Sequence, residues 1–269
     1  MNFDRAKGYF LSYAHDYRVP DFKYEKRKIK MKNSKVLKMI VLAMLVALGV
    51  AISPILRFEG MCPMAHFINI VCSVLMGPWY SLLCATLIGI IRMTTMAIPP
   101  IALTGAIFGA YLSGVFYRMS KGSLIMAVLG EIIGTGIIGA VMSYPVMTFL
   151  WGRDGLSWLF YVPSFVCGTL IGGSIAFVFL RKLSRSGILK TFQAKLAAVC
   201  YEDKSSVLSD SAAIAAFGVI CFMIIKILTG IFKMTAPVWS YIAWGAMAVF
   251  IIGAVIYYFI KRRGLIGLK

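Results

Sequence analysis

Long runs of apolar residues, separated by short polar segments, dominate the chain. The runs cover residues 39–56, 64–97, 101–117, 123–150, 159–180, 210–232 and 236–260. A run of about 18 or more apolar residues is long enough to cross a bilayer as a helix. The pattern therefore predicts an all-α membrane protein.

The run at 64–97 is too long for one crossing and contains a break at Gly77-Pro78. Proline disfavours continuation of a helix, and the adjacent Trp79-Tyr80 pair is typical of a membrane interface. We predict helices at 64–76 and 79–97, followed by one at 101–117. With this division the chain has eight membrane helices.

Polar segments divide the chain into four parts. We predict a basic N-terminal arm at 1–38, a six-helix membrane domain at 39–182, a cytoplasmic linker at 183–209 and two extra membrane helices at 210–269. A short amphipathic helix at 188–199, lying on the membrane surface, is the alternative to an irregular linker. The terminal helix pair either packs beside the six-helix bundle or offers a second partner surface.

The charge distribution supports a membrane location. With 60% hydrophobic and 14% charged residues, the chain lies outside the soluble range, and its net charge of +18 comes from basic blocks between apolar runs. If both termini are cytoplasmic, 23 of the 28 Lys and Arg residues lie inside, while Arg57 and Glu59 lie outside. We therefore predict a multi-pass protein of the cytoplasmic membrane, embedded in the lipid bilayer and without a nucleic-acid partner.

The sequence contains no motif for catalysis or metal binding. None of its six cysteines forms a C-x-x-C pair, and it has no H-E-x-x-H, G-x-S-x-G or P-loop motif. We predict no catalytic residue, no metal and no cofactor. An intramembrane enzyme with His66 or Glu131 as base, or a scaffold without a ligand, are the alternatives from other functional classes.

A carboxylate interrupts the uncharged stretch from Ser123 to Trp151. Burying Glu131 in a membrane helix costs about 2.5 to 3.5 kcal/mol, which marks it as a candidate functional residue. It lies roughly 9 Å toward the cytoplasm from the midpoint of its helix. We expect Glu131 to stabilise a ligand-binding site from its cytoplasmic side, by pairing with Arg92 or accepting a hydrogen bond from Thr135.

Further polar and aromatic residues are expected at the outer ends of the helices. His66 and Asn69 share one helical face and suit a ring nitrogen or a hydroxyl, although they could instead satisfy each other and the loop backbone. Arg92 would orient a ligand, and Tyr144 and Tyr161 would stack on it. An interfacial aromatic belt is the alternative for the two tyrosines.

The first predicted helix carries a stripe of small side chains. Ala43, Ala47 and Ala51 recur at a spacing of four, so another helix can approach closely along this face. The approaching helix belongs either to a partner protein or to the same bundle.

These residues lie in segments that resemble the ThiW-type substrate-binding subunits, or S components, of energy-coupling-factor vitamin transporters. The similar segments are Ala43 to Ala51, Cys62-Pro63-Met64-Ala65-His66-Phe67-Ile68-Asn69, Gly77 to Tyr80, Ile91-Arg92, Gly130 to Ala140, Tyr144-Pro145 and Tyr161-Val162-Pro163. The resemblance implies a six-helix subunit that binds the thiamine precursor hydroxyethylthiazole. It also implies docking, through the alanine stripe, on a transmembrane coupling (T) protein driven by two cytoplasmic ATPases.

Within this family, thiamine itself or another vitamin is the alternative substrate. Thiamine is permanently cationic, so exposure of Glu131 to the ligand would favour it and exposure of Arg92 would disfavour it. Residues 1–30 and 210–260 are additions to the family pattern. We expect translation to begin at Met31, which the intact mass of the natively expressed protein would test.

Overall fold

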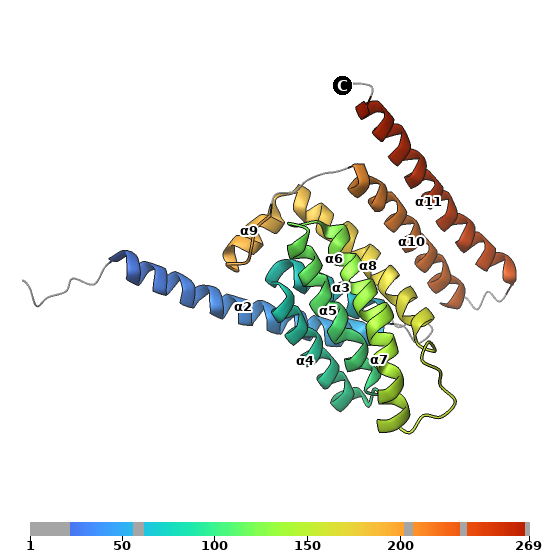
Figure 1. Cartoon of the computed structure of the whole chain (residues 1–269), viewed down its shortest axis with the longest axis horizontal. Coiled ribbons are helices and arrows are strands. Elements are labelled where there is room, and N and C mark those ends of the chain that lie inside the picture. Colours follow the sequence, from blue (N-terminus) through green and yellow to red (C-terminus); the bar gives the residue numbers. More distant parts are fainter. Residues whose placement is uncertain (1–21, 56–61, 202–206, 232–235, 267–269) are drawn as a thin grey trace, which may run out of the picture.

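The structure, a computed structural model, describes residues 22–55, 62–201, 207–231 and 236–266. Every regular element within these ranges is helical, which confirms the predicted fold class (Figure 1). Seven helical segments of the described chain are long and apolar enough to cross a membrane. The chain is therefore a multi-pass membrane protein. The predicted orientation of the termini and the predicted domain boundaries stay predictions, and Arg57 and Glu59 lie outside the described residues.

Helix α2 (Phe22–Ile55) begins well before the predicted residue 39. The segment from 22 to 38 contains neither Gly nor Pro and is rich in Lys, which has a high helix propensity. The apolar part of α2 therefore continues as a helix into the basic segment. Its candidate membrane span is Ser34–Pro54.

The predicted break at Gly77-Pro78 is confirmed. Helix α3 (Pro63–Met76) ends directly before Gly77, whose φ of +95° favours glycine, and α4 (Pro78–Met96) starts at the proline. Helix α5 (Ile101–Met119) follows, close to the predicted range. The positions of proline and glycine in the sequence therefore predicted the breaks between these three helices correctly.

Helix α3 is the centre of the bundle. It has 14 residues and is about 21 Å long at 1.5 Å per residue, which is shorter than the bilayer core. It packs against α2, α4, α5, α6 and α8, and only Phe67 of its residues is not buried. The other helices therefore enclose α3 and shield its polar side chains from lipid (Figure 1).

The predicted helix at 123–150 forms one helical path with local changes of pitch. It consists of α6 (Leu124–Glu131), η1 (Ile132–Gly139), α7 (Ala140–Pro145) and η2 (Val146–Leu150). The η segments are π-helical, and Pro145, which lacks an N–H group, directly precedes η2. Glycines let η1 approach α5 closely: a Cβ on Gly134 would lie 2.5 Å from the Cα of Gly109.

Replacing Gly134 with alanine is expected to destabilise the bundle by about 1–3 kcal/mol, because the added methyl group overlaps the backbone of α5. The matched control is Gly245→Ala, since a Cβ at this helical position meets no atom of the described residues within 4 Å. The thermal midpoint of unfolding in detergent measures the stability of both variants. A lower midpoint for Gly245→Ala than for Gly134→Ala would contradict the close approach of the two helices.

The segment after the sixth membrane helix contains a short helix. Helix α8 (Val162–Arg185) is followed by α9 (Ile188–Lys195), so the segment contains a helix, as in the predicted alternative, although the helix ends before residue 199. Its position on the membrane surface stays a prediction. Gln193 Nε2 donates to Val74 O at 2.9 Å and to Tyr117 Oη at 3.1 Å. These bonds attach α9 to the end of the bundle.

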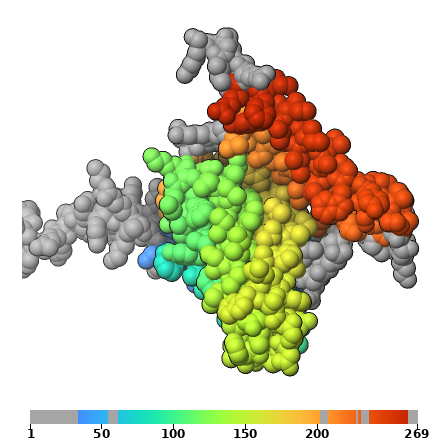
Figure 2. Space-filling view, turned by 45° about the vertical axis from the view of Figure 1, so that its right-hand side comes forward, coloured from blue at the N-terminus to red at the C-terminus, as the bar shows by residue number. Residues whose placement is uncertain are grey.

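The terminal pair, α10 (Val207–Ile231) and α11 (Pro237–Ile266), packs beside the bundle. The two helices contact each other, and α10 also contacts α8. Figure 2 shows α10 in orange next to the yellow surface of α8, and α11 in red beside α10. Of the two predicted placements of this pair, the structure therefore shows packing against the bundle.

Candidate functional site

Helix α3 brings His66 and Asn69 into the interior. Their spacing of three places both on one face, and they are 8% and 1% exposed. The Asn69 backbone carbonyl accepts a hydrogen bond from Ser81 Oγ at 2.8 Å, which fixes α4 against α3. Ser73 Oγ and Ser113 Oγ, 2.8 Å apart, form a second link, from α3 to α5.

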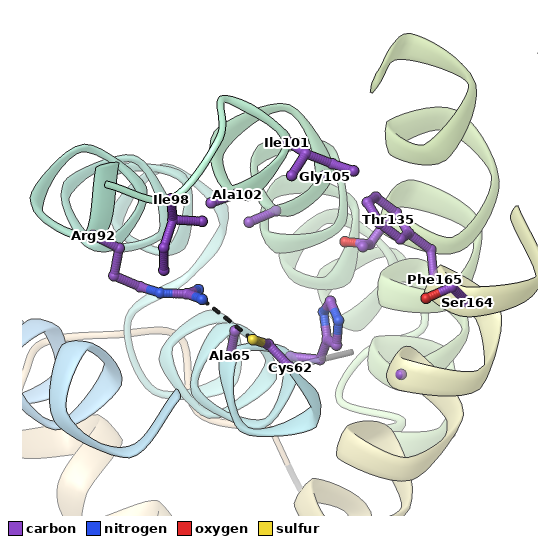
Figure 3. A pocket seen from close by; sticks show the side chains of 13 residues that line it. Cys62, Ala65, Arg92, Ile98, Ile101, Ala102, Gly105, Thr135, Ser164 and Phe165 are labelled. Atoms are coloured by element: carbon purple, nitrogen blue, oxygen red, sulfur yellow. Dashed lines mark hydrogen bonds between the residues drawn. The ribbon is translucent and has the colours of Figure 1, made fainter. Parts of the chain in front are cut away.

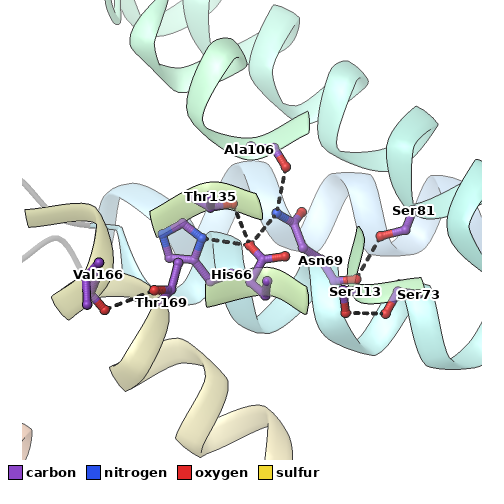
Figure 4. A network of polar contacts seen from close by, with 10 residues as sticks. His66, Asn69, Ser73, Ser81, Ala106, Ser113, Thr135, Val166 and Thr169 are labelled. Carbon is purple, nitrogen blue, oxygen red and sulfur yellow. Dashed lines mark hydrogen bonds and ion pairs between the residues drawn. The ribbon is translucent and has the colours of Figure 1, made fainter. Parts of the chain in front are cut away.

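Three side chains meet one oxygen of Glu131. Figure 4 shows the dashed lines from His66, Asn69 and Thr135 that converge on it. Its Oε1 lies 2.9 Å from His66 Nδ1 and accepts hydrogen bonds from Asn69 Nδ2 and Thr135 Oγ1, both at 3.1 Å. The Glu131 side chain is fully buried. The structure thus places Glu131 directly against His66 and Asn69, and the expected bond from Thr135 is confirmed.

The other expected partner of Glu131, Arg92, does not pair with it. The Glu131 Oε2 atom is buried and has no hydrogen-bond partner among the described residues. Arg92 instead donates from Nη2 to Cys62 Sγ at 3.2 Å.

Glycine at position 109 makes the Glu131 cluster possible. A Cβ on Gly109 would collide with Thr135 Oγ1 and would lie 2.9 Å from the Glu131 carboxyl group. Helix α5 can therefore cover the cluster only with glycine at this position. Sequence reasoning missed Gly109, because nothing in its local sequence indicates which helix it faces.

A cavity of about 90 Å³ lies beside this cluster. It is lined by Cys62, Ala65, His66, Arg92, Ile98, Ile101, Ala102, Gly105, Ala106, Thr135, Ser164, Phe165 and Gly168. Arg92 and Ile98 reach in from one side, while Ser164 and Phe165 lie on the opposite side (Figure 3). The lining is thus mostly apolar, with a few polar groups that could orient a ligand.

Among the described residues, Arg92 is the only Arg or Lys whose side chain lines this cavity. Arg92 is 5% exposed, and its buried Nε has no hydrogen-bond partner among the described residues. Because a buried donor without a partner is costly, a ligand acceptor at this position would stabilise the site.

The predicted tyrosines do not line this cavity. The ring of Tyr144 packs on Trp158, with centroids 4.4 Å apart, and the buried Tyr161 contacts Phe160 and Phe165. Their stacking on a ligand stays a prediction. Phe165, one turn after Tyr161, is the aromatic ring in the lining, and the sequence signal for it is this spacing of four.

A family model described as thiamine-precursor transporter protein (ThiW) matches residues 39–186, more than half of the chain. The chain belongs to the ThiW family. No curated protein and no solved structure matches the chain. The matched segment contains the cavity and the Glu131 cluster, whereas α10 and α11 lie beyond it.

Membership in the ThiW family confirms the resemblance and identifies the chain as a transport component rather than an enzyme. The site geometry suits binding. A carboxylate accepts hydrogen bonds, so the contact with Glu131 places a proton on His66 Nδ1 and leaves Nε2 as the ring nitrogen for a ligand. Arg92 supplies donors on another side of the cavity. Together these groups can bind a small molecule that carries hydrogen-bond acceptors and a hydroxyl group.

Proposed function

We propose that this ThiW-family chain is the membrane-embedded substrate-binding subunit of an energy-coupling-factor importer for hydroxyethylthiazole. The observation that carries the proposal is the charge of the cavity: Arg92 lines it, whereas the Glu131 carboxylate is fully buried behind His66 and Thr135. A cavity that is lined by a guanidinium and shielded from the carboxylate disfavours a permanent cation. This favours an uncharged thiazole over thiamine.

The size of the cavity supports the same substrate class. Its volume of about 90 Å³ is below the range of roughly 300–1,000 Å³ that is usual for drug-sized ligands. A single five-membered ring with a short hydroxyethyl chain suits such a space better than the two linked rings of thiamine. Ligand size and charge therefore point to the same choice.

We assign a binding role to four residues of the lining. Arg92 donates a hydrogen bond to the thiazole nitrogen, His66 Nε2 accepts one from the ligand hydroxyl, and the Phe165 ring packs on the thiazole. Thr135 contributes an apolar methyl group while its hydroxyl bonds to Glu131. Asn69 and Glu131 act through His66 by fixing its ring orientation.

The alanine stripe is the proposed docking surface for the transmembrane coupling protein. Ala43, Ala47 and Ala51 are exposed on α2 and line an apolar groove of about 600 Å³ together with residues of α4 such as Leu87 and Ile91. The described helices of this chain leave the stripe uncovered, which favours a partner over packing within the bundle. A helix of the coupling protein fits this groove because the small side chains allow close approach.

We further propose that the importer lies in the cytoplasmic membrane with both termini of this chain inside. The basic last turn of α8 and the basic segment of α2 would then face the cytoplasmic ATPases.

Uptake of labelled hydroxyethylthiazole into cells tests this assignment. Cells that express the chain with its coupling protein and both ATPases should accumulate the label, and cells whose ATPases carry a disabling substitution in the P-loop lysine should not. Accumulation by the chain without partners would overturn the importer subunit in favour of a self-sufficient carrier.

Replacing His66 with alanine is expected to weaken hydroxyethylthiazole binding about tenfold or more, because one hydrogen bond to the ligand is lost. The measurement is equilibrium binding to purified protein. His15→Ala is the matched control, since His15 lies outside the matched family segment and should leave the affinity unchanged. Equal affinities of both variants and the unmodified chain would exclude His66 as a ligand contact.

A further inference from the structure

The C-terminal end of α8 carries three cations, and two of them contact one carboxylate of α10. Arg185 Nη2 lies 2.8 Å from Asp210 Oδ1, and the Arg181 guanidinium contacts both Asp210 and the backbone carbonyl of Ser209. Lys182 lies between the two arginines in sequence and is exposed. Among the described residues that line this end, Lys182 and Arg185 are exposed cations, and Asp210, which both arginines already contact, is the one carboxylate.

A cavity of about 640 Å³ begins at these charges and extends between α8, α10 and α11. Beyond the charged end its lining is apolar and aromatic. These lining residues are Val178, Ala213, Ile214, Phe217, Phe250 and Tyr257. The cavity is thus amphipathic along its length, and it is separate from the cavity at His66.

The lining indicates what occupies this cavity. A free inorganic anion would use the cations but would leave the apolar part without a partner. A neutral acyl chain would use the apolar part but not the charges. A phospholipid with an anionic headgroup matches both, because its phosphate binds Lys and Arg and its acyl chain packs on apolar side chains.

We propose that this cavity is a binding site for an anionic phospholipid of the cytoplasmic leaflet. The headgroup phosphate contacts Lys182 and Arg185, and one acyl chain lies along Ile214 and the Phe217–Phe250 pair, whose ring centroids are 5.5 Å apart. The lipid contacts α8 on one side and α10 and α11 on the other. It therefore fastens the terminal helix pair to the family-matched bundle.

The test uses the purified full-length chain and native mass spectrometry after incubation with phosphatidylglycerol, phosphatidylcholine or inorganic phosphate. Phosphatidylglycerol should be retained and should raise the thermal midpoint, while phosphatidylcholine and phosphate should do neither. Equal retention of phosphatidylcholine would overturn the headgroup preference. An equal rise in midpoint with phosphate alone would show an anion site without a lipid.

Two variants locate the lipid. The double variant Lys182→Gln with Arg185→Gln should reduce phosphatidylglycerol retention about tenfold. The matched control is Lys190→Gln with Lys195→Gln, which removes two exposed lysines of α9 and should leave retention unchanged. Ile214→Trp fills the apolar part without changing any charge and should also reduce retention. Retention equal to that of the unmodified chain in both the charge variant and Ile214→Trp would overturn the proposal.

Discussion

Replacing Ala47 with tryptophan is expected to abolish uptake of hydroxyethylthiazole while leaving its binding to the purified chain unchanged. The indole group would fill the groove between α2 and α4, where we propose that a helix of the coupling protein docks. The groove is distinct from the cavity that contains Arg92, since the two share no lining residue. Uptake into cells and equilibrium binding to purified protein measure the two activities separately.

Ala248→Trp is the matched control for this substitution. Ala248 is exposed on α11, outside the matched family segment, so tryptophan at this position should leave both uptake and binding intact. Normal uptake by Ala47→Trp would contradict docking at the groove. Loss of binding together with uptake would instead indicate that Ala47 packs within the substrate-binding bundle.

Replacing Glu131 with leucine is expected to destabilise the chain by at least about 2 kcal/mol and to eliminate measurable hydroxyethylthiazole binding. The substitution leaves the buried donors of His66 and Asn69 without their acceptor, and an unsatisfied buried donor costs about 1–3 kcal/mol. His66 would also lose the contact that fixes its ring. The thermal midpoint without ligand and the binding affinity are the two measurements.

Glu131→Gln separates the charge of this residue from its shape. Glutamine retains one acceptor oxygen at nearly the same volume, so we expect a smaller loss of stability and partial binding. Unchanged stability and affinity in Glu131→Leu would contradict the role of Glu131 as the shared acceptor of the cluster.

Local sequence signals predicted the breaks between helices. Gly77-Pro78 separates α3 from α4, where a positive φ and a missing N–H group interrupt the helix. The start of α2 was predicted too late, because hydrophobicity marks the membrane span whereas helix propensity extends the helix beyond it. A break between helices can thus be predicted from single residues, whereas the start of a helix within a polar segment cannot.

The residues of the Glu131 cluster stand out singly in the sequence, but their shared contact does not. Sequence indicated His66, Asn69 and Glu131 as polar residues in apolar helices, yet their shared contact depends on how closely α5 and η1 pack. Stacking of Tyr144 and Tyr161 on a ligand stays a prediction, whereas the aromatic ring in the cavity lining is Phe165, one turn after Tyr161. Successive residues on a helix point about 100° apart, so a cavity-facing residue can be identified only once the rotation of the helix is known.

The most direct test of the proposed substrate is the thermal midpoint of the purified chain with hydroxyethylthiazole and, separately, with thiamine. A ligand that binds only the folded state raises stability by RT ln(1 + [L]/Kd), so the midpoint should rise with hydroxyethylthiazole and stay unchanged with thiamine. The rise should disappear in Arg92→Met, because the donors to the thiazole nitrogen are lost. A rise with thiamine and none with hydroxyethylthiazole would contradict the account.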